Sequence, residues 1–476
     1  MSVPPAPSAP PDRRRGRHFA RAALLALGCA WLAGCTPAGE ARPPDLVLVT
    51  IDTLRPDHLS VYGYARPTTP SLERWFPPEA SAVYERAYSA EAATSPSVVS
   101  FLSGLLPQDH GVRLLHQLLP DATRLVPDLL PAAYESAGFV SNAVLAREAI
   151  GMADRFDHYD DFVDELEPVR KVFERNAART TDAVLAWVGA RADPARPLFL
   201  WVHYIDPHGP YAPPDDWPRR YAHDAPVEIN PRRVNPYMRL PDVRDGLVYV
   251  DRYDEEITYA DREVGRLLDG LDAALGLDDA LVVFTADHGE SMMEHENWFT
   301  HGYHVYDEVV RVPLLVRGAG VVPGRTRAPS SGIDVAATLL RAAGAELPPA
   351  LRGADLRRPD ALPPGRPILV EASDGQRQVR AIVQGGRKVV AAVSPAGEVQ
   401  GIGLFDLEAD PGETTWQPAV TAPRLQATLL EMIRRDPDPG GIPAELAAGR
   451  RPSAPRVAPG VEGEELEKLR ALGYAE

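Results

Sequence analysis

Residues 281–301 read LVVFTADHGESMMEHENWFTH. The first five are apolar and largely β-branched, which predicts a fully buried strand. The run stops abruptly at Ala286-Asp287-His288-Gly289. In open α/β sheets, ligands bind at the carboxyl ends of buried strands, and carboxylate and imidazole are common metal ligands. We therefore predict a metal site at Asp287 and His288, the alternative being an Asx turn with a solvated His288.

The same pattern, a buried strand followed by polar residues, occurs twice more in the chain. Residues 45–51 form a predicted strand that ends in Asp52, and residues 198–204 form another that leads to His208. Helices are predicted between the strands, over residues 126–137, 172–190, 253–275 and 333–343. Strands that alternate with helices predict an α/β fold with a mostly parallel central sheet flanked by helices.

The sequence changes in character after residue 345. The segments 368–371, 379–393, with Gly385-Gly386 in the middle of the second, and 404–407 have the pattern of antiparallel strands and a hairpin. The predicted organisation is a signal peptide at 1–34, a tether at 35–44, a catalytic domain at 45–345, a small C-terminal α+β subdomain at 346–420, and C-terminal helices with a Pro-rich tail at 421–476.

The N-terminus predicts export. Five arginines between residues 13 and 21 precede a short apolar segment that ends in Leu32-Ala33-Gly34-Cys35. Such a segment is too short for a stable membrane anchor. Small residues before a cysteine resemble the lipobox of bacterial lipoproteins, in which Cys35 carries the lipid; the alternative is an ordinary signal peptide. We therefore expect a bacterial lipoprotein that Cys35 anchors to a membrane of the cell envelope, in the outer membrane or facing the periplasm.

Composition restricts the class of protein. The 476 residues are 45% hydrophobic and 25% charged, which is typical of a globular chain with a large core. A net charge of -17 argues against a nucleic-acid partner. Of the 2 cysteines, Cys29 lies in the segment that would be removed and Cys35 would carry lipid, so no disulfide is expected.

A hydroxyl group lies near the start of a predicted helix. Thr94 precedes Pro96, a residue typical of a first turn, and Gly104 would end the helix. Free N–H groups at a helix N-terminus suit an anionic ester, and a hydroxyl bound there to a metal could ionise and attack. His208 and His301 follow strands of the same sheet and could protonate a leaving alkoxide. The alternatives are helix or turn capping for Thr94 and Asp52, and ordinary turns for the histidines.

The chain resembles the sulfatase branch of the alkaline phosphatase superfamily from residue 45 to about 415. The matching motifs, in the order of the family, are IDTLRPDHL at 51–59, SPS at 95–97, LSGLLP at 102–107, HGV at 110–112, HYIDPHGPY at 203–211, TADHGE at 285–290, His301-Gly302, RVPL at 311–314 and LFDLEADPGE at 404–413. The resemblance implies a metal held by Asp52, Asp287, His288 and the oxygen of Thr94. It also implies that His208 and His301 contact the ester.

The departure from the family is at the nucleophile. Sulfatases carry Cys or Ser there, converted to formylglycine, whereas the resemblance places Thr94 at this position and Val98 where an arginine is expected. Formylglycine offers a second hydroxyl that expels sulfate; threonine cannot be converted, but a phospho-enzyme can be released by metal-assisted attack of water. Members of the superfamily with threonine act on phosphorus esters. His288 in place of a common asparagine favours zinc or manganese, with calcium or magnesium as alternatives, and His203 and His208 are candidates for holding a second ion.

The sequence therefore predicts a metal-dependent hydrolase in which Thr94 attacks a phosphate or sulfate ester in line, with the phosphorus ester favoured. The expected substrate is an anionic ester that is small or linked to a glycan or lipid. One alternative is a sulfuric ester hydrolase that works without formylglycine. The other is a non-catalytic surface binding protein of the same fold, a reading that Val98 supports.

Overall fold

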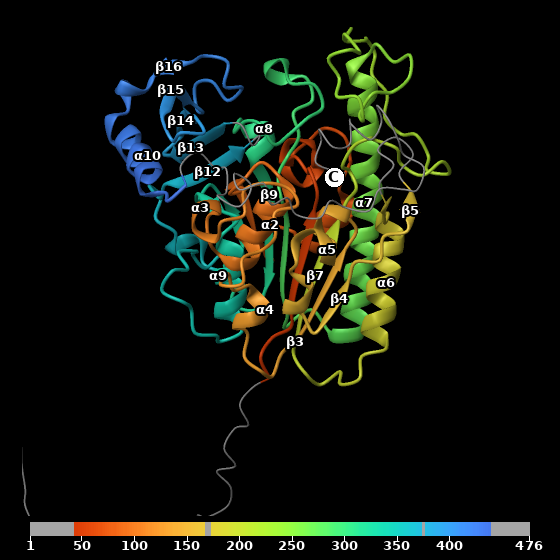
Figure 1. The fold of residues 1–476 in the computed structure, drawn as a ribbon. Helices are drawn as coiled ribbons and strands as arrows, with labels where there is room; N and C mark the ends of the chain where they lie inside the picture. The colour runs from red at the N-terminus through yellow and green to blue at the C-terminus, as the bar shows by residue number, and fades with distance from the viewer. Residues whose placement is uncertain (1–41, 167–172, 374–376, 439–476) are drawn as a thin grey trace, which may run out of the picture. The chain divides into compact units, whose positions relative to one another are not determined.

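The computed structural model describes residues 42–166, 173–373 and 377–438 (Figure 1). The predicted signal peptide, Cys35 and most of the tether, and the C-terminal tail beyond residue 438 lie outside this part of the chain. Within the described part, no helix has both the length and the apolar character needed to cross a bilayer.

The larger sheet has nine strands in the order β10-β2-β9-β8-β1-β7-β3-β4, with β11 beside β2. Their bounds are β1 Leu46–Ile51, β2 Ser81–Tyr88, β3 Glu135–Val140, β4 His158–Asp160, β7 Leu198–Tyr204, β8 Leu281–Ala286, β9 Arg311–Gly318, β10 Gly324–Thr326 and β11 Ser330–Ser331. Strand β9 pairs antiparallel with β2 and β8, and the other pairings of this sheet are parallel. The prediction of a mostly parallel central sheet is confirmed.

Strand β1 is the centre of this sheet. All six of its residues are buried, and it pairs in parallel register with β7 on one side and β8 on the other. Each buried valine, leucine or isoleucine contributes roughly 1.5–3 kcal/mol through removal of apolar surface from water. Because the three strands run in one direction, their carboxyl ends meet at the same edge of the sheet.

Two groups of helices flank the sheet (Figure 1). Helices α1, α6 and α7 pack together, as do α2, α4 and α9. The helix bounds are α1 Pro70–Trp75, α2 Thr94–Ser103, α3 Pro107–His110, α4 Val126–Leu129, α5 Arg147–Ile150, α6 Ala177–Gly189, α7 Gly246–Leu275, α8 Asp307–Val310, α9 Asp334–Ala342 and α10 Pro423–Arg435. Helix α2 ends at Gly104, whose φ of 70° is the left-handed conformation that the sequence analysis required of a stop residue.

A second, antiparallel sheet follows along the chain, as the sequence predicts. It is built from β12 Ile368–Ser373, β13 Gln378–Gln384, β14 Arg387–Val393, β15 Val399–Asp406 and β16 Gln417–Pro418. Gly385 and Gly386 form the turn between β13 and β14, with φ of 58° and 78°. Helix α10 packs its apolar face, which includes Leu425, Leu429 and Ile433, against this sheet.

The helix predicted over residues 126–137 is wrong beyond its first turn. Helix α4 ends at Leu129, and Pro131 follows, a residue that cannot continue a helix. Strand β3 then begins at Glu135. Gly138, the residue that follows the predicted helix, lies inside β3, where a Cβ would stand 2.9 Å from the ring of Tyr159. Close packing against β4 therefore requires a glycine here.

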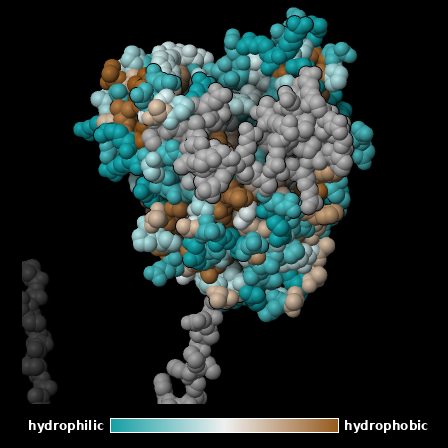
Figure 2. All heavy atoms as spheres, in the orientation of Figure 1, coloured by the Kyte–Doolittle hydropathy of each residue, from teal (hydrophilic) through white to brown (hydrophobic). Residues whose placement is uncertain are grey.

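The face of the molecule shown in Figure 2 is mainly hydrophilic. Hydrophobic side chains gather in small groups on it. The large hydrophobic residues that the described part of the chain exposes include Phe162, Trp416 and Val420. Scattered apolar residues of this kind are normal on a protein surface.

Strands β5 Glu165–Leu166 and β6 Phe173–Glu174 pair with each other and complete the described strands.

Candidate active site

Two carboxyl groups meet where β1 and β8 end. Asp52 directly follows β1 and Asp287 directly follows β8, and both side chains are fully buried. One oxygen of Asp287 accepts hydrogen bonds from the backbone N–H of Thr53 at 3.2 Å and of His288 at 2.7 Å. Asp287 Oδ2 and Asp52 Oδ1 have no hydrogen-bond partner within the described residues. Two buried carboxyls with unsatisfied oxygens are costly unless a cation joins them.

His288 and Thr94 complete the predicted group. His288 Nε2 lies 3.5 Å from Asp287 Oδ2, 3.9 Å from Asp52 Oδ1 and 3.3 Å from Thr94 Oγ1. The other ring nitrogen of His288, Nδ1, donates to the carbonyl of Gly289 at 2.9 Å, which leaves the lone pair on Nε2. The structure therefore brings together all four residues that were predicted to hold a metal.

The position of Thr94 follows from local structure. It is the first residue of α2, whose start is fixed by Ala93 in extended conformation and by Pro96 within the first turn. Ser97, one turn further on, donates its hydroxyl to the backbone carbonyl of Asp287 at 2.6 Å, which ties the start of α2 to the end of β8. Val98 is fully buried in the hydrophobic core, so it presents no polar group to the site.

The sequence analysis missed Asn142 and gave His203 only as a candidate for a second ion. Asn142 follows β3 and donates its side-chain amide to Asp52 Oδ2 at 2.6 Å. His203 lies in β7, opposite Thr50 of β1, and its Nε2 stands 3.7 Å from Asp52 Oδ2. Thr50 Oγ1 lies 2.9 Å from His203 Nδ1 and so fixes the ring. The signal that could have found Asn142 is its place after a strand, which it shares with Asp52.

These residues fit a divalent metal ion. Asp52, His203 and Asp287 each offer one ligand atom within 4.8 Å of the others, and all three are buried. His203 Nε2, like the two carboxylate oxygens named above, lacks a hydrogen-bond partner in the described part of the chain. A mixed carboxylate and imidazole donor set is one that zinc and manganese accept.

The charges of the site point the same way. Burial, with the negative charge of Asp52 beside it, raises the pKa of Asp287 well above its ordinary value. Burial also acts to raise the pKa of Asp52, but the neighbouring histidines, His208 and His203 foremost, outweigh it and hold that pKa below its usual range. Burial lowers the pKa of His288 to about 3, so the imidazole is neutral at neutral pH, the form that binds metals. The raised pKa of Asp287 means that its carboxyl binds a proton more tightly than a free aspartate does, and a divalent ion would compete with that proton.

Two further predicted histidines lie against this group. The ring centre of His301 is 4.5 Å from that of His288 and 5.3 Å from that of His208. His208 is 6% exposed, and its Nδ1 donates to the carbonyl of Gly209 at 2.8 Å. The structure therefore places both candidate proton donors beside the carboxyl groups, although they come from different loops.

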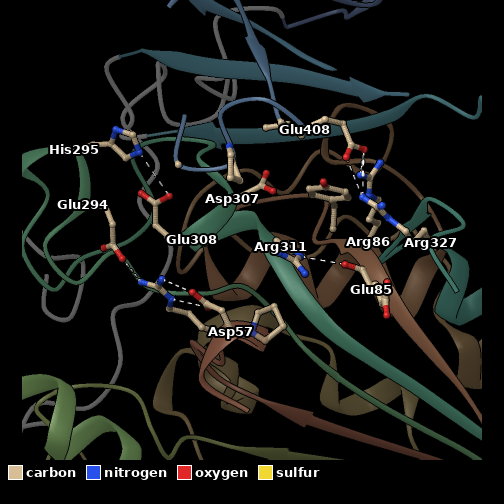
Figure 3. A pocket seen from close by; sticks show the side chains of 16 residues that line it. Asp57, Glu85, Arg86, Glu294, His295, Asp307, Glu308, Arg311, Arg327 and Glu408 are labelled. Carbon is tan, nitrogen blue, oxygen red and sulfur yellow. Dashed lines mark hydrogen bonds and ion pairs between the residues drawn. The ribbon is translucent and has the colours of Figure 1, made fainter. Parts of the chain in front are cut away.

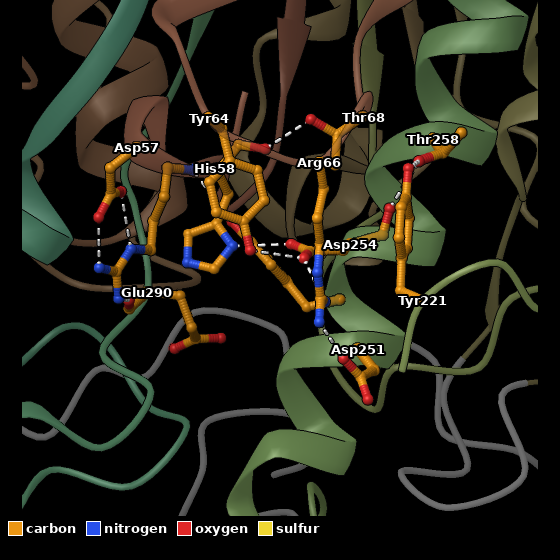
Figure 4. A network of polar contacts seen from close by, with 12 residues as sticks. Asp57, His58, Tyr64, Arg66, Thr68, Tyr221, Asp251, Asp254, Thr258 and Glu290 are labelled. Atoms are coloured by element: carbon orange, nitrogen blue, oxygen red, sulfur yellow. Dashed lines mark hydrogen bonds and ion pairs between the residues drawn. The ribbon is translucent and has the colours of Figure 1, made fainter. Parts of the chain in front are cut away.

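A polar network fixes the loop that follows Asp52 (Figure 4). Asp254 of α7 is fully buried and accepts hydrogen bonds from His58, Tyr64 and Arg66 at 2.7 to 2.8 Å. Tyr253, the preceding residue of α7, donates to the carbonyl of Thr53 at 2.7 Å. Helix α7 therefore holds the backbone that leads away from Asp52.

A cavity of about 520 Å³ opens beyond this loop, between it, the start of β9 and the turn after β15 (Figure 3). Its lining carries many charges, most of which pair with each other. Arg55 bonds Asp57 and Glu294, and Glu408 accepts from Arg86 and Arg327. Because these charges pair with each other, the cavity does not present a surface of one sign of charge.

The comparisons with known proteins identify the family of the chain. The Sulfatase family model matches residues 44–345, more than half of the chain. The chain therefore belongs to the sulfatase family, a family of ester hydrolases, and its buried Asp52, His203 and Asp287 form a possible metal-binding group. Recognition of this family from the sequence motifs is confirmed.

Individual relatives and solved structures resemble the chain at identities of 18% to 36%. The choline-sulfatase of Rhizobium meliloti is 36% identical over 170 residues, which cover 34% of this chain and about a third (32%) of that enzyme. The solved structure of BT4656 with its substrate D-glucosamine-2-N,6-O-disulfate covers 84% of this chain and 99% of that chain, with a TM-score of 0.67 and 18% identity. The solved structure of the phosphonate monoester hydrolase of Agrobacterium radiobacter covers 82% of this chain and 94% of that chain, with a TM-score of 0.64 and 18% identity. The two structures show a shared fold.

Proposed function

We propose that the protein hydrolyses a phosphorus ester by in-line attack of Thr94, with a divalent metal held by Asp52, Asp287 and His288. The observation that carries the proposal is that buried carboxylate oxygens and a ring nitrogen, which could ligate a metal and have no hydrogen-bond partner within the described residues, lie together beside the hydroxyl at the start of α2. His203 is a further candidate ligand, because its Nε2 lies 3.7 Å from Asp52. When bound, the metal would lower the pKa of the Thr94 hydroxyl and neutralise charge on the ester.

The residues of the chain supply the remaining steps. Thr94 Oγ1 gives its proton to water and forms a bond to phosphorus, while the bond from phosphorus to the leaving oxygen breaks. His301, protonated at Nε2, gives that proton to the leaving oxygen, and we assign His208, whose ring centre is 5.3 Å from that of His301, to bind an oxygen of the ester. Backbone N–H groups at the start of α2 face the developing negative charge. Water then attacks the phosphorus of the phospho-enzyme and releases Thr94.

The preference for phosphorus rests on the nucleophile. Thr94 cannot become formylglycine, so a sulfated Thr94 could not expel sulfate through a second hydroxyl. Direct attack of water on phosphorus, assisted by a metal, releases a phospho-threonine. The likeness in fold to a phosphonate monoester hydrolase is compatible with this choice. The favoured metals are zinc and manganese, because His288 supplies an imidazole, with calcium and magnesium as alternatives.

The test is turnover of nitrophenyl phosphate, bis-nitrophenyl phosphate and nitrophenyl sulfate by the purified protein with zinc, manganese, calcium or magnesium. Thr94→Ala should abolish phosphorus-ester turnover. Ser103→Ala is the matched control, because it removes a hydroxyl from the far end of the same helix α2 and should leave turnover within about twofold. Turnover of the sulfate ester alone would instead establish a sulfatase that works without formylglycine. The name of the family and that of its choline-sulfatase relative support a sulfate ester as the substrate.

A binding protein without activity is the remaining alternative. It would hold no divalent ion after dialysis against zinc or manganese and would hydrolyse none of the three esters. The buried Val98 is its best support, because the position expected to hold an arginine carries no charge. The substrate that we expect is an anionic ester, small or linked to a glycan or lipid.

We also propose that the protein is exported and anchored by a lipid on Cys35. The support is the sequence Leu32-Ala33-Gly34-Cys35 after an arginine-rich segment. Expression in a bacterium with labelled fatty acid should label the wild-type protein and place it in the membrane fraction. The Cys35→Ser variant should carry no label; equal labelling of both would overturn the lipid anchor.

A further inference from the structure

A buried carboxylate contacts the imidazole that the proposed function uses as a proton donor. Glu290 is fully buried, two residues after His288, and its Oε1 lies 3.1 Å from His301 Nδ1. A carboxylate accepts, so Nδ1 of His301 carries the proton of this hydrogen bond. Nε2 is then the ring nitrogen that can exchange a proton with a leaving group. Glu290 is the last residue of the TADHGE motif at 285–290, but neither the resemblance nor the candidate metal-binding group gives it a role.

The Glu290 side chain is itself held in place. Tyr211, which is 1% exposed, donates its hydroxyl to Glu290 Oε2 at 3.3 Å. Arg55 donates to the backbone carbonyl of Glu290 at 3.0 Å. Both partners reach Glu290 from other parts of the chain, Tyr211 from the loop after β7 and Arg55 from the loop after β1. Contacts from outside the loop between Glu290 and His301 therefore hold the carboxylate in its orientation toward His301.

The loop that carries His301 needs such a hold. Residues 293–302 include four non-helical conformations with positive φ, at His295, Glu296, Phe299 and Gly302. An imidazole at the end of this irregular segment gains its orientation from contacts rather than from a helix or strand. A second, carboxylate-bonded nitrogen is the usual means of fixing both the tautomer and the ring direction of a functional histidine.

We propose that Glu290 is the positioning residue of the leaving-group histidine: it holds His301 with Nδ1 bonded to the carboxylate and Nε2 presented to the leaving oxygen. This inference rests on the proposed function for its chemical role. The step that it serves is transfer of a proton from His301 Nε2 to the leaving oxygen as the bond from phosphorus to that oxygen breaks. Glu290 gains and loses no proton in this step.

The kinetic test uses the dependence of rate on the leaving group. Wild type, Glu290→Gln and Tyr211→Phe are compared on aryl phosphates, or on aryl sulfates if those are the esters hydrolysed, from phenol to dinitrophenol. A poor leaving group needs a proton, so phenyl ester turnover should fall about 10- to 100-fold in Glu290→Gln, whereas the dinitrophenyl ester should change less than about threefold. Tyr211→Phe should show the same pattern with a smaller amplitude. Glu308→Gln is the matched control, because Glu308 is a nearby carboxyl group that bonds Ser291.

A double-mutant cycle separates this role from general damage. If Glu290 acts through His301, adding Glu290→Gln to His301→Ala should cause no further loss on the phenyl ester. An equal loss for all leaving groups, or additive losses in the double variant, would overturn the inference.

A spectroscopic test does not depend on turnover. Nitrogen NMR of the full protein labelled in histidine, assigned with His301→Ala, should show the proton of neutral His301 on Nδ1 in wild type and in Glu308→Gln. In Glu290→Gln the proton should redistribute to Nε2. An unchanged tautomer would contradict the positioning role even in a protein without activity, whereas an inactive wild type with the expected tautomer would count against the proposed function alone.

Discussion

Two groups of buried carboxyls in this molecule differ in what neutralises them. At the ends of β1 and β8, Asp52 and Asp287 form ion pairs, within the residues described, with histidines alone. At the junction of α3, β13 and the end of α10, Asp436 accepts from both Arg113 and Arg380. All of these side chains are at most 5% exposed. Charges that the protein neutralises itself indicate a structural junction, whereas uncompensated ones mark the place of a bound ion.

The junction has further polar partners. Gln378 accepts from Arg380 Nε at 2.9 Å and donates to Glu371 Oε2 at 2.9 Å, and Arg113 donates to the same glutamine at 3.2 Å. Burial and the charge of Glu371 raise the pKa of nearby Glu91 well above its ordinary value. The junction therefore neutralises Asp436 with arginine side chains, a kind of partner that Asp52 and Asp287 lack within the described residues.

The largest difference between the two groups should appear in activity. Asp287→Asn should lower kcat/KM by about a thousandfold or more, because it weakens metal binding worth several kcal/mol in the transition state. In the presence of EDTA the same variant should unfold at a temperature no lower than wild type, because it removes one of two repelling carboxyls. Metal content by mass spectrometry, turnover and thermal unfolding check the three statements. Bound metal at the wild-type level in Asp287→Asn would refute the ligand assignment.

The junction should behave in the opposite way. Arg380→Met leaves Asp436 and Glu371 with less positive charge in a buried setting, and should lower the free energy of unfolding by about 3–5 kcal/mol. Turnover per folded molecule should stay within about threefold of wild type. Denaturant unfolding measures the loss, and the Arg380→Met, Asp436→Leu double variant should recover part of it. A loss below about 1 kcal/mol would mean that the buried pairs are not what holds the junction.

The sequence predicted the strands around the site closely. Residues 198–204 and 281–285 were predicted as buried strands, and β7 and β8 have these bounds to within one residue. Continuous apolar runs of this length have few other conformations in a large core. Pro131 ends the helix predicted at 126–137 after its first turn, and the residues from Glu135 on form β3 instead. The pairing of β3 with β4, where Gly138 packs against Tyr159, is not revealed by the local sequence.

Residues at the ends of strands were also accessible to sequence reasoning. Asp52, Asp287 and His288 follow apolar runs directly, and parallel strands bring their ends together. His203 could not be assigned in the same way, because it lies inside the run of β7 and its approach to Asp52 depends on the register with Thr50. Asn142 reaches Asp52 only because β3 lies beside β7 in the sheet, an order that the chain does not state.

Removing the metal should distinguish the site carboxyls from the junction carboxyls in a single experiment. A ligand at a hundred times its dissociation constant stabilises the folded state by about 2.7 kcal/mol. EDTA should therefore lower the unfolding temperature of wild type by several degrees, and zinc or manganese should restore it. Arg380→Met should start lower and lose the same amount, since its junction is separate from the site. Asp287→Asn should show almost no shift, and a full shift in that variant would place the metal elsewhere.

The smallest effect should come from a pair that resembles the junction in geometry but not in burial. Arg74 bonds Asp269 through both guanidinium nitrogens, at 2.7 and 3.0 Å, yet the two side chains are 55% and 52% exposed. Solvent screens such a pair, so Arg74→Met should change the free energy of unfolding by less than about 1 kcal/mol, and less still in high salt. Denaturant unfolding beside Arg380→Met gives the comparison directly. If both variants lost the same free energy, pairing rather than burial would set the strength of these contacts, and the unsatisfied carboxyls at β1 and β8 would lose their meaning as a mark of a bound ion.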